Sequence, residues 1–189
     1  PLEQAVVFLA ALASNKSAMQ LLPGEASVYF NNSFVAKTRL ENVAPGEPVR
    51  ISLGVDPAVR LETKPKHTYH EQTGLLSKAS VEVSEHRLVV HNTRSSERVL
   101  LTLRQAIPRS QDEKIKVRVT SPPEVVTENG GDIESAERQA RAPSPGARLN
   151  GQHHLAWTVT LEPSEKKEFL VKYAIEYPGN EKIEVTRAF

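Results

Sequence analysis

The sequence predicts an all-β protein built from Ig-like antiparallel β-sandwich units, two of them packed together. Apolar residues recur at every second position in several segments, and turn residues separate those segments. Successive side chains of a strand point to opposite faces, so each set marks one buried face. The sets lie at residues 49–55, 99–103, 115–119, 155–161 and 169–177. Short strands with turns between them are typical of a sandwich or barrel.

The composition narrows the class of partner. Thirteen prolines, with one methionine and one tryptophan, favour strands and turns over long helices. Twenty-four basic and 23 acidic residues give a net charge of +1, which predicts neither nucleic acid nor a membrane surface as partner. The chain has no cysteine, which excludes disulfides, thiolate metal sites and cysteine nucleophiles. That absence slightly favours a reducing, cytoplasmic compartment.

The apolar run at 5–13 resembles a signal peptide or membrane span in composition. It is too short for a span, and Glu3 stands where a signal peptide carries positive charge. We predict a buried strand here, with an Ala-rich amphipathic helix as the alternative. No membrane span is expected in the chain.

Two repeats predict the division of the chain. Turns at 22–25, 44–47 and 162–165 share a Pro-Gly-Glu or Pro-Ser-Glu sequence, in which proline presets φ and glycine accepts a positive φ. Strand ends at 12–17 and 90–95 each contain an asparagine followed by small polar residues, about 77 positions apart. We therefore predict an N-terminal β unit at 1–72 and a C-terminal Ig-like sandwich at 73–189. A single large sandwich is the alternative.

The segment at about 128–151 breaks the alternating pattern. It is rich in glycine, proline and charged residues, and it has one large apolar residue before Leu149. Such a composition buries too little surface to offset its ordering entropy. We predict a mobile insertion here, with a helical turn near 134–141.

Four strings of this sequence resemble a known domain. They contain the Pro-Gly-Glu turn before Val28-Tyr29, the segment at 52–56, the pair Ile107-Pro108, Trp157 with the turn after it, and the closing Tyr177-Pro178. Together they resemble the C-terminal domain of mucoidy-inhibitor-A-like proteins, the domain of unknown function 4139 family. Residues 128–150 lie outside the resemblance, and Ser164 stands where the family often has glycine.

The resemblance implies a larger parent protein with another β domain and a coiled coil upstream. This chain would then be the C-terminal head, and the coiled coil would make a homo-oligomer. The family carries no catalytic motif to transfer to these positions, and a fold alone does not define an activity.

A metal site is the enzymatic hypothesis with the most residues to support it. The six histidines form pairs separated by three, five and one positions, at 67/70, 86/91 and 153/154. Two ligands share a strand face only at even separations, so no pair chelates from one regular strand. A site assembled from different strands around Asp112, His153 and His154 would make the protein a metal-dependent hydrolase.

Other chemistries have weaker support. No G-x-S-x-G string occurs, and the adjacent glycines at 130–131 lack a phosphate-binding context. A basic stripe of Lys114, Lys116 and Arg118 is more typical of the solvent face of an edge strand than of a nucleic-acid groove. Trp157 and the aromatic residues at 169–177 are interpreted as core, with a ligand platform as the alternative.

The sequence therefore predicts a non-catalytic protein-interaction or scaffolding module whose partner is a protein. We predict no catalytic residue, no metal-binding or cofactor-binding residue, and no cofactor. The alternatives are a metal-dependent hydrolase and a carbohydrate-binding domain that uses an aromatic sheet face.

Overall fold

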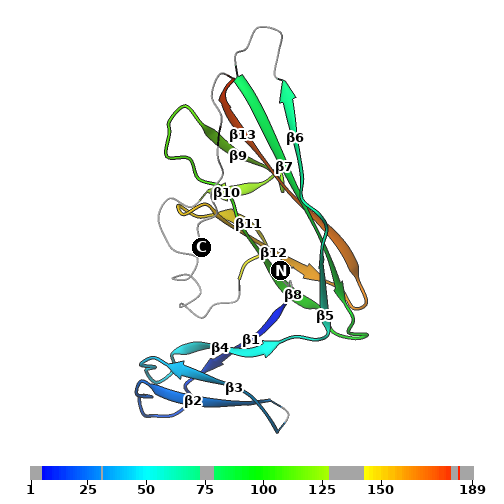
Figure 1. Ribbon diagram of the computed structural model, residues 1–189. Coiled ribbons are helices and arrows are strands. Elements are labelled where there is room, and N and C mark those ends of the chain that lie inside the picture. The colour runs from blue at the N-terminus through cyan, green and yellow to red at the C-terminus, as the bar shows by residue number, and fades with distance from the viewer. Residues whose placement is uncertain (1–5, 31, 73–78, 128–142, 180–182, 184–189) are drawn as a thin grey trace.

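The computed structural model describes residues 6–30, 32–72, 79–127, 143–179 and 183 (Figure 1). Every regular element in this part of the chain is a β-strand, and the strands pack as sheets. The predicted all-β fold class is confirmed. The helical turn predicted near 134–141 lies outside the described residues.

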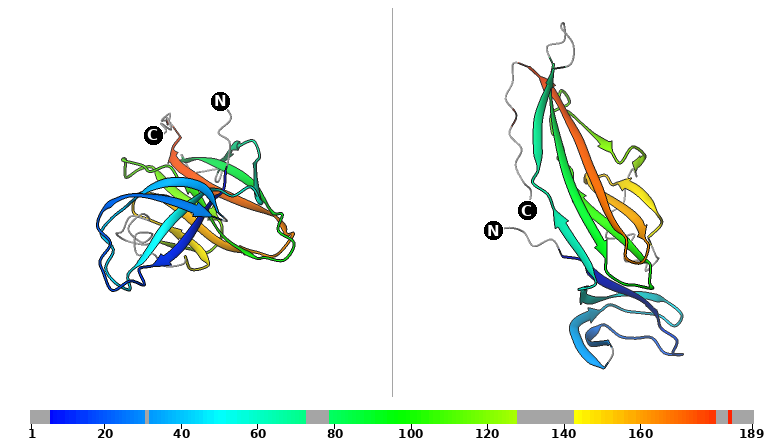
Figure 2. Two further views of the ribbon diagram at one scale, coloured as in Figure 1. Left: turned by 90° about the horizontal axis from the view of Figure 1, so that it is seen from below. Right: turned by 90° about the vertical axis from the view of Figure 1, so that its right-hand side faces the viewer.

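In the described residues, thirteen strands form two units of unequal size (Figures 1 and 2). The smaller unit contains β1 (Phe8–Ser14), β2 (Gly24–Phe30), β3 (Ser33–Leu40) and β4 (Pro48–Val55). The larger unit contains β5 (Val59–Thr63), β6 (His67–Gln72), β7 (Ala79–Asn92), β8 (Val99–Ala106), β9 (Lys116–Ser121), β10 (Val125–Thr127), β11 (Gly146–Leu149), β12 (His154–Leu161) and β13 (Lys166–Pro178). The alternating segments at 49–55, 99–103, 155–161 and 169–177 all fall inside strands, and 115–119 begins one residue before β9.

The larger unit is a two-sheet sandwich. One sheet has the order β5-β7-β13-β9, with β6 also paired to β7, and the other has the order β10-β11-β12-β8. All pairs are antiparallel except β10 with β11. The long strands β7 and β13 run together along the whole unit (Figure 2). Strand β9 ends its sheet, and its Lys116 and Arg118 are exposed, as predicted for the solvent face of an edge strand.

The core of the sandwich lies between the two sheets. Phe169 is 1 % exposed, and its ring meets Trp157 edge-on at a centroid distance of 5.1 Å. Tyr173 is also buried, and Tyr177 packs at the border of the same core. The interpretation of these aromatic residues as core is confirmed.

The smaller unit has two short sheets and little interior. Strand β1 pairs with β4, and β2 pairs with β3, both antiparallel. The predicted strand near residues 5–13 is confirmed, but the prediction that it is buried is wrong: Phe8 is 64 % exposed and Leu12 is 47 % exposed. A pair of two-stranded sheets is too narrow to cover both faces of β1.

Strand pairing places the division between the units before β5. Strands β5 and β6 both pair with β7, so a boundary at residue 72 would separate hydrogen-bonded neighbours.

The predicted insertion at 128–151 is also too long at its end, because residues 146–149 form β11, which pairs with β12. Residues 128–142 lie outside the described part of the chain. Hydrophobic periodicity finds strands but does not say which strands pair.

The predicted repeat is a structural repeat. Asn15 directly follows β1 and Asn92 is the last residue of β7, and in each unit the asparagine side-chain oxygen accepts from the backbone N–H two residues later. The backbone N–H of Asn15 donates to the backbone carbonyl of Glu47 at 3.0 Å, and the backbone N–H of Asn92 donates to that of Glu165 at 2.9 Å. Both glutamates lie in the turn that precedes the paired strand. In those turns Gly46 has φ 77° and Ser164 has φ 57°. The third predicted turn differs, because Gly24 lacks a positive φ and begins β2.

Candidate interaction surface

Exposed apolar side chains are concentrated on the smaller unit. Among the described residues, 13 large hydrophobic side chains are exposed, and ten of these belong to residues 6–55. The other three are Tyr69, Leu100 and Val126. Single exposed apolar residues are ordinary, but a concentration of them on one small unit makes that unit a candidate contact surface.

The most prominent part of this surface is the hairpin of β2 and β3. Tyr29, Phe30 and Phe34, which we call the aromatic tip, are 65 %, 49 % and 56 % exposed. The rings of Tyr29 and Phe34 meet edge-to-face at 5.8 Å. Leu22, just before β2, is 77 % exposed. Aromatic side chains supply large contact area with few rotatable bonds, so they are common anchors in protein interfaces.

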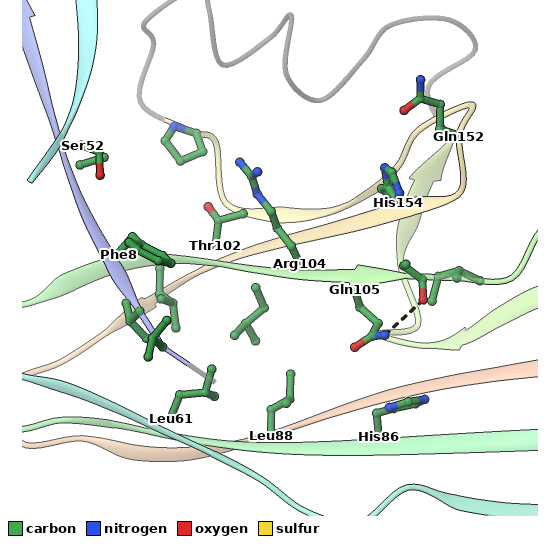
Figure 3. A pocket seen from close by; sticks show the side chains of 18 of the residues that line it. Phe8, Ser52, Leu61, His86, Leu88, Thr102, Arg104, Gln105, Gln152 and His154 are labelled. Carbon is green, nitrogen blue, oxygen red and sulfur yellow. Dashed lines mark hydrogen bonds between the residues drawn. The ribbon is translucent and has the colours of Figure 1, made fainter. Parts of the chain in front are cut away.

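An open groove of about 2670 Å³ lies between the two units. Strands β1 and β4 form one wall, β8 forms another, and β5, β7 and β13 contribute residues at the base. Figure 3 shows Thr102, Arg104 and His154 on one side of β8 and Leu61 and Leu88 on the other. The groove therefore reaches both faces of β8, whose second edge carries no partner strand in the described chain.

A partly buried ion pair joins the units beside this groove, which Asp56 lines. The Arg94 guanidinium nitrogen lies 3.0 and 2.8 Å from the two carboxylate oxygens of Asp56. The Asp56 side chain is 4 % exposed and also accepts from the Ala58 amide at 3.0 Å. The Thr93 amide and hydroxyl both donate to the Ala58 carbonyl. These contacts anchor the segment between β4 and β5 to the corner after β7.

The residues of the metal-site hypothesis have structural contacts of their own. The Asp112 carboxylate accepts from the Lys114 amide at 2.9 Å, within the turn that leads to β9. The His153 ring nitrogen Nδ1 lies 3.0 Å from the Pro108 carbonyl oxygen, and His154 lies beside the groove (Figure 3). In the described part of the chain no three His, Asp or Glu side chains are arranged to hold a metal ion.

Two groups of the described chain with shifted pKa values, Glu85 and Lys172, lie away from the groove. The Tyr69 hydroxyl donates to the Glu85 carboxylate at 3.0 Å, and this bond is the main cause that lowers the pKa of Glu85. Contact with Tyr69 is also the main cause that raises the pKa of Lys172, whose ammonium lies 3.5 Å from Glu85. Arg87 completes this surface network at 3.5 Å from Glu85.

Comparison with known proteins decides the family. A domain of unknown function, DUF4139, matches residues 7–179. The chain belongs to the DUF4139 family. The predicted membership is confirmed, and it covers both structural units.

A curated relative of this DUF4139 chain is Protein F37C4.5 of Caenorhabditis elegans. The two are 36 % identical over 189 residues, which is all of this chain and 32 % of the nematode protein. The chain thus spans about a third of the length of that relative. No solved structure matches this DUF4139 chain. Among the described residues of the DUF4139 chain, no helix is long and apolar enough to cross a membrane.

Sequence reasoning missed the aromatic tip of this DUF4139 domain. A signal was present, because Tyr29 and Phe30 are neighbours in one strand and must point to opposite faces. A small two-stranded sheet with large aromatics on both faces exposes at least one of them. The Asp56–Arg94 pair had no such signal, since 38 residues separate its partners.

Proposed function

We propose that this DUF4139 domain is a non-catalytic protein-interaction module, and that its smaller unit is the surface that contacts a partner protein. The observation that carries this proposal is the concentration of exposed apolar side chains in residues 6–55. Leaving such a cluster in water is unfavourable by about 25 cal/mol for each Å² of apolar surface. A partner that covers the aromatic tip would recover that free energy.

The larger unit supports the proposal as a rigid base. Its interior holds two buried clusters with Trp157 packed against both, and the Asp56–Arg94 pair anchors the smaller unit to it. A rigid base lowers the entropy lost when a surface binds, which increases affinity. The arrangement suits a scaffold that presents one face to a partner.

The test changes one side chain of the aromatic tip and the nearby Leu22, and leaves the core intact. The double variant Leu22→Ser/Phe34→Ser removes two side chains that are 77 % and 56 % exposed, so the domain should still fold. The matched control is Val126→Ser, which removes a side chain 62 % exposed on the larger unit. Both are expressed in place of the natural protein, and contacts are measured by chemical cross-linking and mass spectrometry.

We expect the double variant to lose cross-links between the smaller unit and partner proteins, and Val126→Ser to keep them. Equal cross-links in both variants would contradict the proposal. So would a purified wild-type domain that turns over ester or peptide test substrates and loses the turnover in His154→Ala. That second result would favour a metal-dependent hydrolase instead.

A further inference from the structure

The two units repeat the same four-strand arrangement, but only one has its flanking strands. In the larger unit β7 runs to the Asn92 corner, β8 pairs with β12, and a turn leads into β13, which returns beside β7. In the smaller unit β1 runs to the Asn15 corner, β2 pairs with β3, and a turn leads into β4, which returns beside β1. The repeat therefore makes β1 equivalent to β7.

Strand β7 has neighbours on both edges, whereas β1 has a neighbour on one. In addition to β13, β7 pairs with β5 and β6 on its other edge. Strand β1 pairs with β4 and with no other strand of the described chain. The consequence appears in burial: Val90 of β7 is fully buried, and the equivalent Ala13 of β1 is exposed.

The free edge of β1 differs from the other free edges of the smaller unit. Sheet edges are commonly protected by charged residues or proline. Strand β2 carries Glu25, β3 carries Lys37 and Arg39, and β4 carries Arg50 and begins at Pro48. Strand β1 has the sequence FLAALAS, without a charged residue or a proline. An uncharged edge beside exposed apolar side chains is suited to accept another strand.

We propose that the free edge of β1 binds an extended polypeptide strand antiparallel to it, supplied by a part of the polypeptide outside these 189 residues. This inference goes beyond the proposed function, because it concerns the edge of β1 and a strand of the same polypeptide, not the partner protein that contacts the aromatic tip. In the nematode relative about two thirds of the polypeptide lies outside the matched region, since the match covers 32 % of it. Polypeptide of sufficient length to supply a strand is therefore present in that protein.

Strand β5 shows what the bound strand should look like. Val59 of β5 pairs with Asn92, and Leu61 pairs with Val90. Val59 is buried and Leu61 packs against the core. The alternate residues of the strand, Arg60 and Glu62, are exposed. By the repeat, the bound strand places two apolar residues, two positions apart, opposite Asn15 and Ala13. Its intervening residue is polar and faces solvent.

Hydrogen–deuterium exchange tests this pairing directly. The amides of residues 6–14 are followed in the 189-residue chain and in the full-length polypeptide that contains it. We expect these amides to exchange at least about tenfold more slowly in the full-length polypeptide, because a strand on both edges protects them. The amides of β7 serve as the internal reference and should not change.

Two results would overturn the inference. Equal exchange of β1 in both forms would show that no strand adds to this edge. Exchange of β1 that becomes slower as the concentration of the 189-residue chain is raised, with nothing else added, would show that a second copy covers the edge. The cross-linking of the aromatic tip is a separate measurement, so a partner lost with Leu22→Ser/Phe34→Ser but no protection of β1 would leave the proposed function standing.

A charge placed on the edge provides a second test. Leu12→Lys, at a side chain 47 % exposed, should abolish the extra protection of β1 in the full-length polypeptide. Val126→Lys adds the same charge to the larger unit, at a side chain 62 % exposed, and the protection should remain. Protection that persists in Leu12→Lys would count against strand addition at β1.

Discussion

Removing Arg94 should destabilise the junction between the units. In Arg94→Met the Asp56 carboxylate, 4 % exposed, loses both oxygen contacts to the guanidinium and keeps the amide of Ala58. Breaking a buried pair by removing one partner costs about 3–5 kcal/mol. Because the Arg94 side chain is 22 % exposed and water can reach the site, we expect about 3 kcal/mol.

Urea unfolding measures this change. The one tryptophan of the chain, Trp157, lies against Phe169 in the larger unit, so its fluorescence follows that core. With a urea dependence of about 2 kcal/mol per molar, the unfolding midpoint should fall by about 1.5 M. The control is the same substitution in an Asp56→Asn background, where the carboxylate charge is absent and the loss should be smaller by about 1–2 kcal/mol. An unchanged midpoint in Arg94→Met, or equal losses in both backgrounds, would refute the role assigned to this pair.

Three further outcomes can be measured on the same domain. Phe169→Ala should cost about 3–5 kcal/mol in chemical unfolding, because the ring is 1 % exposed and its loss leaves a cavity; a loss below 1 kcal/mol, on the order of a surface substitution, would be inconsistent with its place in the core. Ser164→Gly should stabilise by up to about 1 kcal/mol and Gly46→Ala should destabilise by about as much, because both positions have a positive φ; thermal midpoints that move in the same direction would contradict this. Glu85→Gln should lower stability near neutral pH and leave it unchanged in acid. The hydrogen bond from Tyr69 lowers the pKa of Glu85 in the folded state. The contribution of the Glu85 carboxylate to stability is therefore present above the unfolded pKa and is lost as the pH falls through the folded pKa. A wild-type and variant difference that is constant with pH would contradict this assignment.

The sequence predicted the strands because their signal is local. Alternation at 155–161 and 169–177 identified β12 and β13, and the repeated asparagine found the two equivalent corners. Alternation also assigned Trp157 and Phe169 to the core. It failed at β1, since an apolar run does not reveal whether a second layer is present to cover it.

What the sequence by itself determined is the all-β class, the strand positions and the repeat of the asparagine corner, since each depends on neighbouring residues. The tertiary structure alone decided that β5 and β6 belong to the larger unit, that Arg94 meets Asp56, and that β1 keeps an open edge. These features depend on contacts between residues far apart in the chain. Periodicity contains no information on such pairings, because it describes one strand at a time.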